Sequence, residues 1–393
     1  MVFVPRGLPG ELVRVQVVEE RRDFARGELV TVLRGAAQRI DPPCAHYAEG
    51  CGGCSWQHAD YSLQLQLKQA IVVDQLGRIG HFPYAEELVR PPLGMLEPWH
   101  YRNQARFTVG RRFGELCFTH RGSHRLLRIE QCWIVHPSID AVLRVAQGRL
   151  ADIQRHIHQI SVRVGANTGE LLISPALPEI PELESGQPHL EEELLGRRFR
   201  LQPPSFFQVN TRREQRDLPS GIQRAWLPLP ANGLSMADLL ALLVVDRLSP
   251  DPADVVVDAY SGVGTFALLL APLVRETVGI EEARSAIRDA EHNARDVPNV
   301  RFVEATTEAA LPSLSVRPSA VVLDPARAGC HPEVLRALLA TRPARIVYVS
   351  CDPSTLARDL RVLVDGGYTL HEVQPLDMFP QTYHVECVAL LTA

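Results

Sequence analysis

The sequence predicts an α/β protein whose C-terminal half is a doubly wound, mostly parallel sheet. Short apolar segments typical of buried strands alternate there with helical patterns, at 255–258, 278–281, 300–303, 320–323, 345–350 and 385–391. The first segment leads directly into a glycine turn at 258–264 and then into an apolar helix start. Strands that alternate with helices form parallel sheets, because each crossover lays a helix on one face. Ahead of this half we expect a small β-barrel and a central mixed α+β domain.

Length and composition limit the class of protein. At 393 residues, of which 46% are hydrophobic, the chain can form two or three domains with sizeable cores. No apolar run reaches the ~18 residues of a membrane span, and the first residues lack a signal-peptide pattern. We therefore expect a soluble, cytoplasmic protein without a membrane partner. We also expect a monomer. The net charge of −5 argues against a uniformly basic nucleic-acid binder but allows a local basic face; we expect no DNA partner.

The N-terminal segment, residues 1–40, contains two candidate strands at 11–18 and 27–33. The first alternates apolar and polar residues, as a half-buried strand does. Two or three short strands indicate a small, OB-like β-barrel. A β-extension without a binding role is the alternative.

Cysteines mark the start of the central segment, residues 41–200. Three of the eight, Cys44, Cys51 and Cys54, lie within eleven residues, which is typical of a metal or cluster site and unlike a secreted disulfide framework. A fourth ligand is needed, and Cys132 is the best candidate. Three clustered thiolates closed by a distant one suit a cubane iron–sulfur cluster. Structural zinc and free thiols are the alternatives.

The rest of the central segment predicts a helix and an arginine-rich sheet. The helix runs from Tyr61 to about Ile79. The stretch 101–113 places arginines, Arg111 and Arg112 among them, beside aromatic residues. Arginines with aromatics can hold phosphates and stack unpaired bases; a solvated sheet with outward arginines is the alternative. Strands at 160–164 and 170–174 should pair, 175–196 reads as a loop, and a helical region should follow 203–210.

Chemistry-bearing residues stand where the C-terminal strands end. Glu281 ends the second strand, Asp324 and Cys351 follow the fourth and fifth, and Glu386 stands beside His384 at the start of the last. Ligands bind at the carboxyl ends of such strands. The glycine turn and Glu281, which is placed to hold a ribose, indicate a nucleotide-type ligand. The glycine pattern alone leaves its identity open.

One reaction needs a thiolate and a carboxylate at such an edge. Uracil C5 is a poor nucleophile, but a thiolate that adds to C6 pushes electron density onto C5, which can then attack a methyl sulfonium. A carboxylate must next remove the C5 proton so that the thiolate can leave. Cys351 and Glu386 fit these two roles.

With these motifs, the chain resembles the RNA uracil-C5 methyltransferase family over nearly its whole length. The resemblance rests on the boxes at 324–329, 348–351 and 377–386, and the Asp-x-x-x-Gly-x-Gly turn resembles the S-adenosyl-L-methionine loop of Rossmann-like methyltransferases. It implies a Rossmann-like methyltransferase domain over 201–393, RNA as partner, Cys351 as nucleophile and Glu386 as base. It also implies donor contacts from Gln208, Tyr260, Thr265, Glu281, Thr306 and Asp324.

The resemblance extends to the N-terminal half. Cys44, Cys51, Cys54 and Cys132 match the 4Fe–4S cluster ligands of the iron–sulfur branch of the family, which acts mostly on large-subunit ribosomal RNA. It therefore implies 23S ribosomal RNA as substrate, with tRNA as the alternative. The N-terminal strands resemble a TRAM domain, and the central segment resembles the family's RNA-binding domain.

The chain also departs from the family pattern. Asp352 replaces the usual asparagine and Ala326 the second proline, and the TRAM-like barrel, which starts at Met1, looks truncated. The rival hypotheses are a cytosine-C5 methyltransferase and a non-catalytic RNA-binding iron–sulfur protein.

Overall fold

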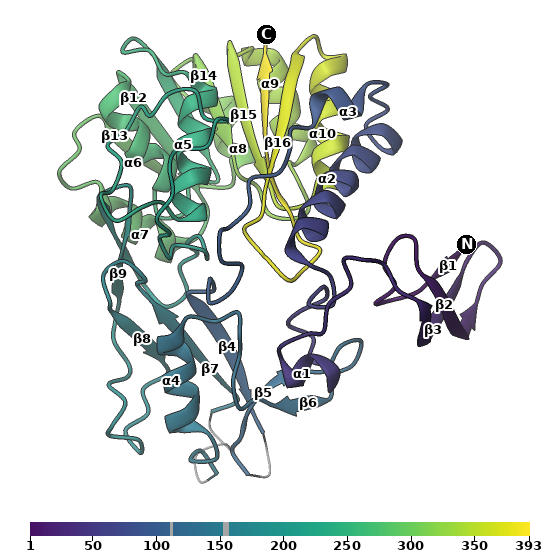
Figure 1. The fold of residues 1–393 in the computed structure, drawn as a ribbon. Helices are drawn as coiled ribbons and strands as arrows, with labels where there is room; N and C mark the ends of the chain where they lie inside the picture. Colours follow the sequence, from purple (N-terminus) through teal and green to yellow (C-terminus); the bar gives the residue numbers. More distant parts are fainter. Residues whose placement is uncertain (111–112, 152–156) are drawn as a thin grey trace.

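The computed structural model describes residues 1–110, 113–151 and 157–393. Figure 1 shows the α/β layers of the C-terminal half at the top, an antiparallel sheet below them, and a small N-terminal sheet to one side. The predicted contribution of Arg111 and Arg112 to an RNA-binding surface lies outside the described residues. No helix within those three ranges has the length and apolar character of a membrane span.

Within the described residues, a seven-stranded sheet forms the centre of the C-terminal half, in the order β13-β12-β11-β14-β15-β17-β16. The first five are parallel, whereas β17 runs antiparallel to both β15 and β16. The six predicted strands are confirmed, and β16 was missed because its apolar positions are interrupted by His371, Glu372 and Pro375. The strands are β11 Val255–Ala259, β12 Glu276–Glu281, β13 Val300–Glu304, β14 Ala320–Leu323, β15 Arg345–Ser350, β16 Thr369–Leu376 and β17 Glu386–Thr392.

Helices cover both faces of this sheet (Figure 1). On one face, Val256, Val322 and Val347 share a buried cluster with α5, α6 and α7. On the other, their neighbours Val257 and Val321 share a cluster with α8, α9 and α10. The predicted doubly wound architecture is therefore confirmed. The helices are α5 Met236–Leu248, α6 Thr265–Leu270, α7 Arg284–Asn293, α8 Thr307–Ala310, α9 Pro332–Thr341 and α10 Pro353–Asp365, with short 3₁₀ turns at Ala271–Leu273 and Leu311–Ser313.

The helix predicted at 61–79 is confirmed as α2, Tyr61–Arg78. Asp60 caps it, because its Oδ1 accepts a hydrogen bond of 2.7 Å from the Leu63 amide. Val72 and Leu76, with the short helix α3 (Ala85–Leu88), pack in the same cluster as α9 and α10. A helix from the predicted central segment is thus part of the C-terminal layers, while the division at residue 200 stays a prediction.

The central part is a five-stranded antiparallel sheet in the order β6-β5-β4-β7-β8 among the described residues. The predicted pairing of 160–164 with 170–174 is confirmed, since Val164 stands opposite Leu171. On β4, Ala105, Phe107 and Val109 are buried while Arg106 is exposed. The elements are α1 Ala45–Ala48, β4 Gln104–Val109, β5 Leu116–Thr119, β6 Leu126–Arg128, α4 Pro137–Ala146, β7 Gln159–Val164 and β8 Leu171–Ser174.

Two expectations for the connection to the C-terminal half were wrong. The predicted loop 175–196 contains β9 (Leu190–Leu194), which pairs with β10 (Arg197–Leu201). The strand was missed because three of its five residues are glutamates, although alternate residues along it are buried. The helical region expected after 203–210 does not follow directly, because residues 202–234 hold no helix and α5 begins at Met236.

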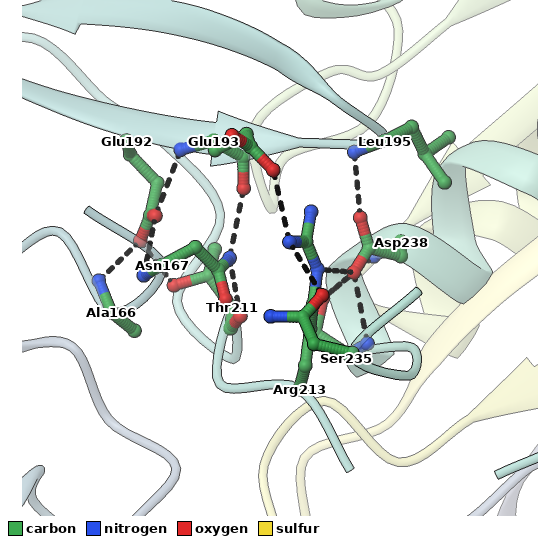
Figure 2. A network of polar contacts seen from close by, with 10 residues as sticks. Ala166, Asn167, Glu192, Glu193, Leu195, Thr211, Arg213, Ser235 and Asp238 are labelled. Carbon is green, nitrogen blue, oxygen red and sulfur yellow. Dashed lines mark hydrogen bonds and ion pairs between the residues drawn. The ribbon is translucent and has the colours of Figure 1, made fainter. Parts of the chain in front are cut away.

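A polar network ties this connection to its neighbours (Figure 2). The carboxylate of Glu192 on β9 accepts hydrogen bonds from the amides of Ala166 (2.8 Å) and Asn167 (3.1 Å) in the β7–β8 turn. Arg213 donates to Asp238, at 3.3 Å, in the first turn of α5. The Leu195 amide, just after β9, donates to the same carboxylate at 2.8 Å. The central sheet is therefore joined to the C-terminal layers by directional hydrogen bonds to two buried carboxylates, those of Glu192 and Asp238.

The N-terminal segment forms an open sheet in the order β1-β3-β2, with strands Val2–Phe3, Ala25–Arg34 and Leu12–Glu20. Both predicted strands are confirmed, but the closed barrel is not. Three strands are too few to close on themselves. Apolar side chains on the open sheet, such as Val17, Val30 and Leu33, are exposed.

Candidate active site

Five parallel strands bring the predicted residues to one edge of the sheet. Tyr260 follows β11, Glu281 ends β12, Thr306 stands just beyond β13, and Asp324 and Cys351 follow β14 and β15. A hydrogen bond of 3.4 Å from the Asp324 amide to the carbonyl of Ala259 joins two of these ends. The edge therefore gathers the thiol of Cys351 and the carboxyl groups of Glu281 and Asp324, as expected from the strand pattern.

Cys351 and Glu386 are brought together by the antiparallel strand. Ser350 pairs with Cys387, so the next pair of positions toward the edge is Cys351 and Glu386. Glu386 is 5% exposed and Cys351 is half-buried. Burial raises the pKa of Cys351 to about 11; the charge of Glu386 raises it further and that of Arg327 opposes this. The register places the candidate nucleophile, Cys351, directly across from the candidate base, Glu386.

Three carboxyl groups at this edge, those of Glu386, Asp324 and Asp258, have raised pKa values. Burial, reinforced by Asp324, holds the pKa of Glu386 well above its ordinary value. Burial also raises the pKa of Asp324 to about 7 and that of Asp258 to about 8. A cationic ligand would lower these pKa values by favouring the charged carboxylates. The edge is therefore electrostatically suited to a positively charged group such as a sulfonium.

The glycine turn at 258–264 is braced from β12. Gly262 (φ 54°) and Gly264 (φ 85°) adopt left-handed conformations that glycine tolerates, and Tyr260 shares the region at φ 70°. Glu281 accepts hydrogen bonds from the amides of Gly262 (3.0 Å) and Ala283 (2.8 Å). The acid expected to meet a ribose therefore also fixes the turn.

Two further predicted residues stand at helix starts, and one lies apart. Thr265 begins α6 and Thr306 is the N-cap residue of α8. The hydroxyl of Tyr260 faces Thr307 and Cys330, and burial raises the pKa of Tyr260. Gln208 lies on the connecting segment, where Asn103 Nδ2 donates to its carbonyl at 3.1 Å. Within the described residues no hydrogen bond joins Gln208 to the glycine turn.

The four predicted cluster ligands line one cavity of about 520 Å³, together with Cys117. The Gly53 amide donates to Cys51 Sγ at 3.4 Å, a contact typical of thiolates around iron–sulfur clusters. Burial raises the pKa of Cys54 to about 12 and that of Cys132 to about 11. Among the residues that the structure describes, however, no three His, Cys, Asp or Glu side chains are grouped closely enough to hold a metal ion. The cavity has the donor set of a cluster site, and the cluster itself stays a prediction.

Sequence reasoning missed how the loop that precedes Glu386 is held. Lys68 on α2 donates to Asp377 Oδ1 at 2.5 Å and to the carbonyl of Phe379 at 3.1 Å. Gln64 and Gln381 exchange two hydrogen bonds, both of 2.9 Å. Lys68 is the only lysine of the chain, which singled it out in the sequence. The sequence pattern did not show that Asp377 is its partner.

The segment after Cys54 also holds this loop. The amides of Ser55 and Trp56 donate to the carbonyl of Gln381, at 2.9 and 3.0 Å. The cysteine-rich segment therefore contacts the candidate catalytic loop directly.

Several known proteins are similar to this chain. Residues 241–393 match the family model described as tRNA (Uracil-5-)-methyltransferase. An uncharacterized RNA methyltransferase of Gloeobacter violaceus is 36% identical, over 100% of this chain and 91% of the relative. Another, of Halalkalibacterium halodurans, is 34% identical, over 99% and 92%. The crystal structure of Pyrococcus abyssi tRNA (uracil-54, C5)-methyltransferase in complex with S-adenosyl-L-homocysteine has the same fold (TM-score 0.73, 24% identity, 100% of this chain and 95% of that chain).

Proposed function

Because this chain belongs to the RNA (uracil-5-)-methyltransferase family and is an S-adenosyl-L-methionine-dependent RNA methyltransferase, we propose that it methylates C5 of a uridine in ribosomal RNA. The observation that carries the proposed chemistry is the pairing of Ser350 with Cys387, which sets Cys351 across from Glu386. The target uridine must leave its stack or lie in a loop, since a duplex buries C5 and C6.

The proposed reaction uses Cys351 twice and Glu386 once. The Cys351 thiolate adds to C6, and the electron pair of the C5–C6 double bond moves toward C5. C5 then takes the methyl group from the sulfonium, which leaves as the neutral thioether S-adenosyl-L-homocysteine. Glu386 removes the C5 proton, the double bond re-forms, and the Cys351–C6 bond breaks to release the thiolate.

The electrostatics of the edge support a sequence in which the donor binds before Glu386 ionises. Without a cation, burial holds the pKa of the Cys351 thiol at about 11 and that of the Glu386 carboxyl well above its ordinary value. A bound sulfonium adds positive charge beside Asp324 and Glu386, which lowers the pKa values of both carboxyls. The donor would therefore help to ionise the base that completes the reaction.

We place the donor between the glycine turn and the neighbouring strand ends. In this placement Glu281 binds the ribose hydroxyls and Asp324 faces the charged portion of the donor. The remaining proposed contacts are Gln208, Tyr260, Thr265 and Thr306.

We also propose that Cys44, Cys51, Cys54 and Cys132 hold a 4Fe–4S cluster. Their shared cavity and the Gly53 N–H···S contact support this assignment. When bound, the cluster would crosslink residues 44–54 to the turn around Cys132. The same four cysteines match the cluster ligands of the family branch that acts mostly on ribosomal RNA. We prefer ribosomal RNA as the substrate for this reason.

A tRNA substrate is the second candidate, favoured by the description of the family model and by the tRNA substrate of the Pyrococcus abyssi enzyme. Mass mapping of 5-methyluridine in a strain that lacks this protein separates the two. One missing ribosomal methyl group, restored by the wild-type gene but not by Cys351→Ala, is the expected result. Loss from tRNA alone would overturn the ribosomal assignment, and no loss in either RNA would favour a non-catalytic role.

A further inference from the structure

The loop at 377–386 buries nearly all of its side chains. Asp377 and Met378 are completely buried, Gln381 is 3% exposed and Glu386 is 5% exposed. Tyr383 is the exception: it is 55% exposed and is the only exposed residue of the loop, all of which is described. Within the described residues its hydroxyl group makes no hydrogen bond. An exposed aromatic ring on an otherwise buried loop is available for contact with a ligand.

The backbone that carries Tyr383 is firmly held. The carbonyl of Pro380 accepts a hydrogen bond of 3.0 Å from the Tyr101 hydroxyl, and that of Gln381 accepts two from Ser55 and Trp56. Thr382 Oγ1 donates to the carbonyl of Phe379 at 2.7 Å. The tyrosine ring is therefore presented to solvent from a fixed position.

The position of Tyr383 is beside the reacting groups. Its ring centroid lies 4.4 Å from that of His384, and His384 Nδ1 lies 3.5 Å from Arg327 Nη2. The charge of Arg327 acts on Cys351, and Glu386 follows Tyr383 by three residues. The exposed ring thus stands at the rim of the edge that would receive a nucleotide.

We propose that Tyr383 stacks on an unpaired base of the RNA substrate next to the target uridine, with the exposed guanidinium of Arg327 beside the adjoining phosphate. This inference rests on the proposed function. A uridine that leaves its stack exposes the face of a neighbouring base, and an aromatic side chain replaces that lost contact whatever the base. Tyr383 would thereby be a substrate-binding residue that stabilises the opened RNA.

The test compares Tyr383→Ala and Tyr383→Phe with the wild-type protein. The substrate is an RNA fragment that spans the mapped uridine and carries 2-aminopurine beside it. Tyr383→Ala should weaken RNA binding by on the order of tenfold to a hundredfold and raise KM, while donor affinity stays unchanged. The quenching of 2-aminopurine that stacking causes in the wild type should be lost with Ala and kept with Phe.

The matched control is Tyr84→Ala, because Tyr84 is similarly exposed (68%) but stands at the start of α3. It should bind RNA and quench as the wild type does. Equal binding and quenching by Tyr383→Ala and the wild type would overturn the stacking assignment alone. A wild-type protein that neither binds nor methylates the fragment would instead refute the proposed function. If Tyr383→Ala loses donor binding, RNA binding and quenching are compared between Tyr383→Leu and Tyr383→Phe instead. Leu fills similar space without a π face, so the stacking assignment predicts that only Phe keeps both.

Discussion

Lys68 and Asp377 form a completely buried ion pair, with Nζ 2.5 Å from Oδ1 and neither side chain exposed. The pair joins α2, from the first quarter of the chain, to the loop between β16 and β17. Asp377 Oδ1 also accepts a hydrogen bond of 3.0 Å from the Phe379 amide. The shape of the loop therefore depends on a charge that the sheet itself does not supply.

The first prediction concerns this pair. Lys68→Met should lower the free energy of unfolding by ~3–5 kcal/mol, because it leaves Asp377 buried without its counter-ion. Urea denaturation measures the loss. Adding Asp377→Asn should recover part of it, since no buried charge then remains. The control is Arg336→Met, which breaks the exposed pair with Glu333 and should cost at most ~1 kcal/mol. Equal free energies of unfolding for Lys68→Met and Arg336→Met would show that breaking the buried pair costs no more stability than breaking the exposed one.

The second prediction tests the base. Glu386→Gln should lower turnover by about 100-fold or more and leave protein covalently attached to RNA, because the C5 proton cannot be removed. A shifted band that survives denaturing electrophoresis detects this adduct. Cys351→Ala is the control: it should bind the donor normally, give no turnover and form no adduct. Wild-type turnover by Glu386→Gln would mean that another group is the base.

The third prediction tests the cysteine site by two substitutions in one cavity. Cys54→Ser should lower the iron and sulfide content of purified protein and remove its brown colour, because one of four ligands is gone. Cys117→Ser should retain both, since Cys117 lines the cavity but is not among the four proposed ligands. Metal analysis and the visible spectrum measure the difference. The ligand assignment fails if the two variants hold equal amounts of iron.

The fourth prediction concerns pH. Burial raises the pKa of Asp258 to about 8, whereas an aspartate in an unfolded chain titrates near about 3.9. The folded state thus binds this proton more tightly, so the stability it contributes is present at low pH and is lost as the pH rises from about 4 to about 8. Between pH 5 and 8.5, Tm of donor-free wild type should therefore fall more steeply than Tm of Asp258→Asn. Parallel curves would contradict the raised pKa.

Much of the fold could be predicted because burial on both faces leaves a local signature. The runs around Val256, Val322 and Val347 are nearly continuous apolar segments, as parallel strands require. Strand β16 lacks this signature, since His371 and Glu372 lie in its first half and Pro375 lies near its end. Its assignment depends on pairing with β17, which the local sequence does not encode.

The candidate site could be predicted where residues stand directly at strand ends. Asp324 and Cys351 need only the rule that parallel strands end at one edge. The supports of the site could not be predicted in the same way. Gln64 and Gln381 are polar residues whose local sequence does not show that they pair. They are 317 positions apart, so their hydrogen bonds form only after the chain has folded.

The 309 positions between Lys68 and Asp377 also bear on how the protein is made. At about 5–20 residues per second, a ribosome adds Asp377 roughly 15–60 s after Lys68. During that interval the nascent α2 has neither its counter-ion nor the β16 strand against which it packs. The N-terminal portion therefore lacks these contacts for most of translation. We expect such a chain to bind chaperones before α2 packs against β16.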